Sequence, residues 1–312
     1  LSGDESESET LDVVQRRWLA GEISNFDYLM HLNREADRSY RDLTQYPIMP
    51  WIITDYKSSE LSLDDQRLFR NLSQPTSAFK SEQVRPRNYV SCPEYVLHFL
   101  VREQPEVMIC LHNGKFENKL FVDVAKCWER VQSGRSNDVR ELIPQFYDTE
   151  KGGKFLLNLD NIDFGRVKGK RVGDVRLPPW AEGSAETFVQ KMREVLDSEY
   201  VSARLHGWID HIFGYKLGPA EESEDQADNQ LRRLSDDGGA DSDAKQKTLT
   251  ARKAEQDPRT KKLKELEIKT YGQKPKQLFT KPHPAWSSKG FQQSAVSTAV
   301  APTRARAISH SP

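Results

Sequence analysis

The sequence has 312 residues, of which 36% are hydrophobic and 30% are charged, and its formal net charge is -1. A chain this polar cannot be packed evenly from end to end, but its 6 tryptophans and 9% aromatic content exclude disorder throughout. The balanced charge carries no electrostatic signature of nucleic-acid binding, and no apolar run approaches the length of a membrane span, about 18 residues.

The acidic residues 1–10 predict a disordered tail that precedes the ordered part of the chain. Leu11, Val14 and Trp18 then recur at the spacing of a helix face, and Gly21 follows as a helix stop. We therefore expect a first helix that begins near residue 11.

Capping residues mark the starts of further helices. Ser24 and Asp27 form a variant capping box, Pro93 suits a first helical position, and Ser184 is a candidate N-cap. Two more helices are expected, one at 121–131 and one after residue 200. In all five helices, apolar residues at helical spacing define the buried face. In chain order these faces are Tyr28, Leu29 and Leu32; Val96, Phe99 and Leu100; Phe121, Val124, Trp128 and Val131; Phe188, Met192 and Val195; and Val201, Leu205, Trp208, Ile209 and Ile212.

Residues 40–51 fit neither the period of a strand nor that of a helix. Pro47 and Pro50 remove N–H donors and push their neighbours toward extended conformations, and the many apolar side chains predict burial. Because buried irregular backbone must find hydrogen-bond partners, we expect polar side chains to supply them. The candidates are Asn25, Asp42 and Gln45.

Later segments are less regular. We expect a short strand or a pair of loops at 155–164 and a connector at 171–180. After residue 218 the composition becomes acidic and rich in Ser, Gln and Gly, which predicts a disordered insert at 219–256.

A last ordered stretch at 257–284 is expected to return to the domain whose main part is 11–218, and residues 285–312 form a polar tail. Asp257 and Pro258 start its helix and Gly272 ends it, with Leu263, Leu266 and Tyr271 on one face.

The three cysteines, Cys92, Cys110 and Cys127, include no Cys-x-x-Cys pair, which argues against disulfides or structural zinc and for a reducing compartment, the cytoplasm. A hydrolase would need a nucleophile beside a base. Cys92 or Cys127 could meet a histidine in space, but core packing is the favoured interpretation of Cys127. The histidines available are His98, His112 and His206.

No cofactor or metal is expected. His206 and His211 are five residues apart, a spacing that does not place both on one helix face, and Glu94 and His98 fit a helical surface pair. Residues 165–170 lack the spacing of a phosphate loop and indicate a basic turn.

Basic residues also cluster between 252 and 281, where they could meet an anionic membrane surface. The interleaved Glu255, Glu265 and Glu267 favour a solvated helix face instead.

Four stretches of the chain resemble the BEACH domain, in the order in which that family has them. They are residues 21–33 with 38–51, which end in RDLTQYPIMPW; residues 138–147 with DVRLPPW at 174–180; residues 200–216, which contain LHGWIDHIFGYK; and YGQKPKQLFTKPHP at 271–284, which resembles the family's closing motif. The resemblance extends from about residue 11 to 284, interrupted by the insert. The chain departs from the family at Asp37, where Gly is usual, at the short stretch 77–91, and at the insert.

The resemblance implies a single, mainly α domain with helices around a core of extended irregular segments. It also implies a non-enzymatic scaffold in vesicle and lysosome traffic and in receptor signalling. In this family the domain follows a PH-like domain, docks onto it, and precedes WD repeats. Residues 95–102, 108–116 and 144–148 resemble the FAN-like branch, which is linked to activation of a neutral sphingomyelinase, more than the neurobeachin branch.

The residues that match the family's motifs are expected in the core or along a groove for partners. They are Asn25, Tyr40, Asp42, Gln45, Tyr46, Pro47, Pro50, Trp51, Pro178, Pro179, Trp180, His206, Trp208, Asp210, Phe213, Gly214, Tyr215, Lys216, Gln273 and Pro275.

The expected partners are proteins, namely a PH-like domain in cis and receptor or trafficking proteins, with peripheral membrane association and no nucleic acid. The alternative is a lipid or ester hydrolase that uses a Cys or Ser with a His.

Overall fold

The computed structural model describes residues 9–83, 89–111, 116, 120–217 and 258–287. Within these ranges the protein is mainly helical, as predicted. The helices are α1 (Leu11–Leu19), α2 (Asn25–Glu35), α3 (Pro93–Leu100), α4 (Pro105–Leu111), α5 (Val124–Gln132), α6 (Ala185–Leu196), α7 (Glu199–Ile212) and α10 (Pro258–Tyr271). The segments predicted to be disordered, 1–10, 219–256 and 285–312, lie almost entirely outside the described residues.

The helices begin where the capping residues predict. The Ser24 hydroxyl accepts a hydrogen bond from the Asp27 N–H at the start of α2, and Ser184 accepts one from Thr187 at the start of α6. Pro93 is the first residue of α3. Local sequence patterns therefore predict the starts of α2, α3 and α6.

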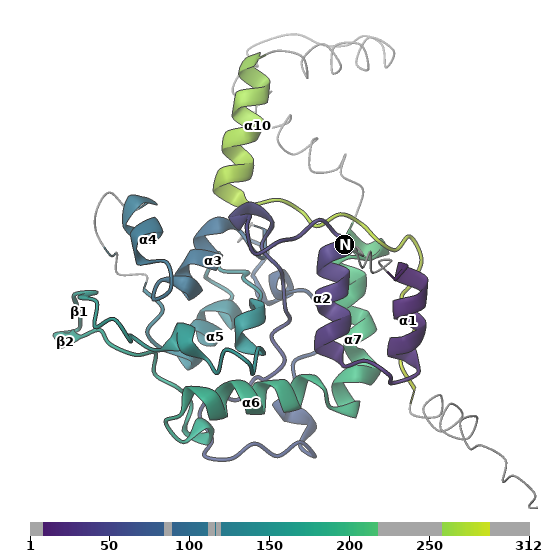
Figure 1. Ribbon diagram of the computed structural model, residues 1–312, viewed down its shortest axis with the longest axis horizontal. Coiled ribbons are helices and arrows are strands. Elements are labelled where there is room, and N and C mark those ends of the chain that lie inside the picture. Colours follow the sequence, from purple (N-terminus) through teal and green to yellow (C-terminus); the bar gives the residue numbers. More distant parts are fainter. Residues whose placement is uncertain (1–8, 84–88, 112–115, 117–119, 218–257, 288–312) are drawn as a thin grey trace, which may run out of the picture.

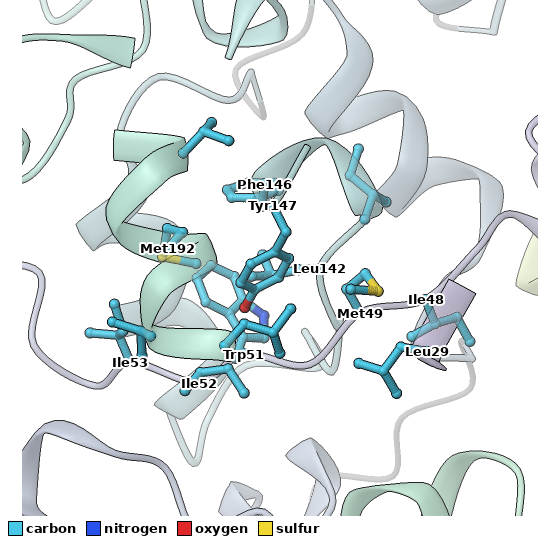
Figure 2. Close-up of a cluster of buried hydrophobic side chains, with 14 of the residues drawn as sticks. Leu29, Ile48, Met49, Trp51, Ile52, Ile53, Leu142, Phe146, Tyr147 and Met192 are labelled. Atoms are coloured by element: carbon cyan, nitrogen blue, oxygen red, sulfur yellow. The ribbon is translucent and has the colours of Figure 1, made fainter. Parts of the chain in front are cut away.

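Figure 1 shows α1, α2 and α7 on one side of the molecule, α3, α4 and α5 on the other, and α6 across one end. Extended segments pass between these helices and carry the core. Residues 46–53 are all buried there, and the aromatic and aliphatic side chains of this segment meet Leu142, Phe146, Tyr147 and Met192 (Figure 2). A single bridge, between Met49 and Leu142, is the strand-like pairing that residues 46–51 make.

A two-stranded antiparallel hairpin leaves the body beyond the 155–164 segment. Its strands are β1 (Arg166–Val167) and β2 (Lys170–Arg171), and they confirm the predicted basic turn. Of the residues 155–164, the first two belong to a short 3-10 turn at Lys154–Leu156, and the rest form loops.

Helix α10 differs from its prediction. All residues from 261 to 270 are exposed, including Leu263 and Leu266, so of the expected apolar face only Tyr271, which is half-buried, is covered by described residues. Figure 1 shows the helix projecting from the body, with its C-terminal end near α3. Gly272 ends it with a φ of 81°, and a Cβ at this position would lie 2.8 Å from the Cα of Cys92. Glycine is therefore required there.

None of the helices in the described ranges is both long enough and apolar enough to cross a bilayer.

Candidate protein-docking surface and the closing segment

The proline-rich segment is held by polar side chains that come from elsewhere in the chain. The Asn33 side chain accepts from the Ile48 N–H at 2.8 Å and donates to the Ile48 carbonyl at 2.9 Å. The Glu141 carboxylate accepts from the Trp51 N–H at 2.9 Å. These side chains satisfy backbone groups that a neighbouring strand would satisfy in a sheet. Of the predicted side chains, Asp42 binds backbone of the 40–51 segment, at the Thr44 N–H, whereas the Asn25 amide binds the Leu196 carbonyl elsewhere and the Gln45 amide faces Asp42.

Asn25 serves a different junction. Its side chain accepts from the Trp18 indole at 2.7 Å and donates to the Leu196 carbonyl at 2.7 Å and to the Ser202 hydroxyl at 2.8 Å. One amide thus ties α1, α2, α6 and α7 together. Asp42 accepts from the Thr44 N–H, so it orders the turn at the start of the 40–51 segment, as predicted.

A buried ion pair supports the same segment from below. Arg70 donates to Glu141 at 2.8 Å, and both side chains are 1% exposed. Arg70 also donates to the Gln74 carbonyl at 2.9 Å. Burial raises the pKa of Glu141, and the charge of Arg70 opposes that rise. Hydrogen bonds from Arg70 and from the Trp51 N–H satisfy the Glu141 carboxylate, as a buried ion pair requires, whereas the buried Nε of Arg70 has no hydrogen-bond partner among the described residues.

Residues 272–286, which we call the closing segment, bring three of the motif regions together. The Gln273 N–H donates to the Thr44 carbonyl at 3.0 Å, and Arg38 donates to the Gln273 carbonyl at 3.2 Å. Further along, the Leu278 N–H donates to the Phe213 carbonyl at 2.8 Å. In Figure 1 the segment runs from the base of α10 across the molecule and down beside α1.

His283 fixes the end of the closing segment. Its backbone N–H donates to the Asp210 carboxylate at 2.8 Å, and its ring Nδ1 lies 3.0 Å from the Pro284 carbonyl. A carbonyl can only accept, so Nδ1 carries the proton and Nε2 accepts from Tyr28 at 2.6 Å and Gln15 at 3.1 Å. Burial lowers the pKa of His283 to about 4, which keeps the ring in this neutral form.

Most other predicted residues lie in the core. Trp51 and Trp208 are 0% and 1% exposed, which confirms their predicted burial. Trp180 is buried as well, but it contacts Asp55 and Phe188 and not the closing segment. The remaining buried members are Tyr46, Pro47, Pro50, Pro178, Asp210, Phe213, Gly214 and Pro275, and His206 is half-buried.

A smaller group reaches the surface. Tyr40 is 45% exposed; its ring packs edge-on against Tyr46 at 5.4 Å, and the Lys151 ammonium lies 5.3 Å from its centre. The half-buried side chains of Asp42, Gln45 and Gln273 belong to the same region. We call Tyr40, Asp42, Gln45, Lys151 and Gln273 the Tyr40 surface. Tyr215, Lys216 and Pro179 are exposed elsewhere.

The two buried thiols, Cys92 and Cys127, are poorly suited to nucleophilic catalysis. Burial raises the pKa of Cys92 and of Cys127 to about 12 in each case, so neither thiol is ionised near neutral pH. Cys127 packs in the core, as predicted. His112 lies outside the described residues.

The described residues give little support for metal binding at the histidines considered above. His211 hydrogen bonds to the Ser73 carbonyl, and in the described part of the chain no three His, Cys, Asp or Glu side chains gather into a possible metal site. One hollow of about 160 Å³ is lined without Cys or His, by Thr54, Asp55, Tyr56, Lys57, Ala125, Trp128, Glu129 and Gln132.

Sequence reasoning missed the residues that organise the site: Asn33, Arg38, Arg70, Glu141 and His283. Each is a polar residue within or beside an apolar or proline-rich run, and all five are buried. A buried polar residue in such a run needs a partner, so this pattern is the signal that could have found them.

Comparison with known proteins agrees with this arrangement. The family model described as the Beige/BEACH domain matches residues 16–286. The chain is 40% identical over 293 residues to BEACH domain-containing protein A2 of Arabidopsis thaliana, covering 86% of this chain and 8% of that protein. Identity to Protein SPIRRIG of Arabidopsis thaliana is 40% with the same coverages, 86% and 8%. Identity to Beige protein homolog 1 of Saccharomyces cerevisiae is 36% over 311 residues, covering 90% of this chain and 13% of that protein. The match covers residues 16–286, which include the core segment and the closing segment, and it shows that the chain belongs to the BEACH domain family.

Proposed function

We propose that this chain is a non-enzymatic scaffold that docks other proteins during membrane trafficking. The observation that carries the proposal is the Tyr40 surface, where the exposed Tyr40 ring packs against Tyr46, whose hydroxyl makes a buried hydrogen bond with Gln145. The high pKa values of Cys92 and Cys127 weigh against the cysteine form of the alternative, a lipid or ester hydrolase that uses a Cys or Ser with a His.

The Tyr40 surface has the properties of an interface centre. Tyrosine supplies a large, amphipathic contact area with few rotatable bonds, so little entropy is lost when a partner covers it. Tyr40 is also held in place by the Tyr46 ring and by Lys151, and Tyr46 in turn binds Gln145 at 2.5 Å. A preorganised aromatic of this kind lowers the cost of binding.

The partner we propose is a PH-like domain in cis, together with receptor or trafficking proteins on the cytoplasmic side of a membrane. The names of the relatives support the BEACH assignment, and the chain spans only 8% to 13% of their length, which leaves room for flanking domains in those proteins. A narrower form of the proposal, receptor-linked activation of a sphingomyelinase, is supported by the FAN-like segments at 95–102 and 144–148.

The test is a pull-down of a PH-like domain, with the full 312-residue chain as bait. Tyr40→Ala should weaken binding at least tenfold and leave the melting temperature unchanged, because nearly half of the side chain is exposed. Leu63→Ala is the matched control, since Leu63 is also 45% exposed but lies away from this surface in sequence.

Equal binding by Tyr40→Ala and the wild-type chain would remove the Tyr40 surface as the docking site. Loss of binding in Leu63→Ala as well would indicate a general defect. Hydrolysis of sphingomyelin or of simple esters by the purified chain would contradict the scaffold proposal itself.

A further inference from the structure

The β1–β2 hairpin concentrates positive charge in a way that its fold does not require. Residues 166–171 contain four cations, Arg166, Lys168, Lys170 and Arg171, and no acidic residue. Within the described ranges, no carboxylate forms an ion pair with any of the four. Arg166 donates to the Gly169 carbonyl at 3.1 Å, and Arg171 donates to the Asn161 carbonyl at 3.4 Å.

The strand register makes this charge unfavourable for the hairpin alone. Arg166 pairs directly with Arg171, and Val167 pairs with Lys170. Like charges directly opposite each other destabilise an antiparallel pair. Because neighbouring residues alternate between faces, Arg166 and Arg171 share one face and Val167 and Lys170 share the other. Val167 is half-buried against a small apolar cluster, so the two arginines occupy the opposite, outer face.

The turn shows a second unfavourable choice. Lys168 and Gly169 both have positive φ, 50° and 78°, as a two-residue hairpin turn of type I′ requires. Asn or Gly is strongly preferred at the first of these positions, and a lysine there is strained. The hairpin therefore carries a strained cation at its tip in addition to an opposed pair of arginines.

An exposed apolar side chain lies in the neighbouring loop. Leu159 is 68% exposed, in a tight loop closed by hydrogen bonds between Asn158 and Ile162. Arg171 connects the hairpin to this loop through Asn161. Asp160, next to Leu159, and Asp163 also lie here; the Asp163 carboxylate accepts from the Gly165 N–H, and neither carboxylate forms an ion pair with a described basic side chain.

We propose that the hairpin tip, together with Leu159, is a contact site for an anionic membrane surface. Cations beside an exposed leucine are suited to lipid phosphates and to the apolar region beneath them. The choice of a membrane over a protein or a nucleic acid follows from that leucine and from the small, projecting shape of the hairpin in Figure 1. This inference rests on the proposed scaffold role at membranes and assigns it a surface distinct from the Tyr40 surface.

The test is co-sedimentation of the full chain with vesicles of phosphatidylcholine containing about 30% phosphatidylserine, compared with phosphatidylcholine alone. Each basic residue near such a surface contributes roughly a fivefold gain in binding. Lys168→Asn should therefore reduce binding about fivefold, while a better turn residue maintains or raises the melting temperature. Arg166→Glu changes the charge by two and should reduce binding about twenty-fivefold, although it replaces a repulsive pair by an attractive one.

The matched control is Lys261→Gln combined with Lys262→Gln on α10, which removes two exposed cations far from the hairpin. This variant should bind vesicles as the wild-type chain does. Added salt should weaken wild-type binding, because exposed charges are screened.

Three results would overturn the proposal: hairpin variants that bind like the wild-type chain, loss of binding in the α10 variant alone, or hairpin-dependent binding of RNA or an acidic peptide without vesicle binding. A chain that binds a PH-like domain through Tyr40 but does not bind anionic vesicles would refute this inference without contradicting the scaffold proposal.

Discussion

The imidazole Nε2 of His283 lies 2.6 Å from the hydroxyl of Tyr28, although 255 residues separate them in sequence. The same ring packs against Trp18, with the ring centres 5.4 Å apart. One histidine near the end of the described chain therefore closes the fold onto its first two helices, and several measurements can test how much the domain depends on it.

The first prediction concerns pH. The pKa of His283 is lowered to about 4 in the folded protein, so the unfolded chain takes up the proton first as pH falls. The stability that the neutral His283 ring contributes is fully present above about pH 6.5 and is lost progressively as pH falls toward about 4. Between pH 7 and pH 5 the free energy of unfolding should fall by about 2 kcal/mol from this residue.

Urea unfolding of the wild-type chain and of His283→Gln at both pH values isolates this contribution, because the other titrating groups are common to both. The difference in stability between the two chains should shrink as pH falls. A difference that stays constant would contradict the neutral, buried histidine.

The second prediction concerns the Arg70–Glu141 pair. Arg70→Met should lower the free energy of unfolding by about 3–5 kcal/mol, because it leaves a buried carboxylate unpaired. Arg70→Met with Glu141→Leu should cost less than Arg70→Met alone, because the unpaired buried charge is removed. The double variant should still be less stable than the wild-type chain, because the Trp51 N–H then lacks its acceptor.

Denaturant unfolding measures both variants. The exposed pair Lys57–Glu129, at 2.7 Å, is the control, and Lys57→Met should leave the unfolding midpoint nearly unchanged. A double variant less stable than the single one would show that Glu141 contributes chiefly through Trp51.

The third prediction concerns Asp37, a position at which the resemblance to the family predicts glycine. Asp37 has a φ of 61° just after α2, the left-handed conformation in which glycine commonly follows a helix. Asp37→Gly should stabilise the chain by about 0.5–1 kcal/mol, because the exposed ion pair with Lys276 contributes little. Thermal unfolding of Asp37→Gly beside Asp37→Ala tests this, since alanine keeps the strain and loses the polar side chain.

The fourth prediction concerns Trp51. Its ring lies 5.2 Å from Trp128 and its indole N–H donates to the Arg140 carbonyl at 2.9 Å. Trp51→Ala should therefore lower the free energy of unfolding by about 3–5 kcal/mol. Trp286→Ala, at a half-buried tryptophan of the closing segment, should cost clearly less when both are measured by chemical denaturation. Equal losses would mean that the closing segment is as essential to the core as residues 46–53.

Much of the helical framework could be predicted because it depends on local patterns. Ser24 and Ser184 cap their helices, and Pro93 begins one, for reasons contained in the neighbouring three or four residues. The burial of Trp51 and Trp208 followed from their apolar surroundings.

The partners of the proline-rich segment could not be predicted in the same way. Asn33 lies 15 residues from Ile48, and Glu141 lies 90 residues from Trp51. Nearby polar residues such as Asp42 were equally plausible from sequence, because the need for a partner does not specify where in the chain it comes from.

Helix α10 shows a different limit of pattern reasoning. The spacing of Leu263, Leu266 and Tyr271 indicates which side chains share a face, but not whether another element covers that face. Both leucines are more than half exposed, at 53% and 60%.

The closing segment also has a consequence for synthesis. Tyr28 leaves the ribosome long before His283, and at roughly 5–20 residues per second the intervening 255 residues take on the order of 13–50 s. During that interval Trp18 of α1 and Tyr28 of α2 lack the histidine ring that later packs against both. A growing chain of this domain should therefore expose Trp18 and Tyr28 to chaperones until nearly its last described residues have emerged.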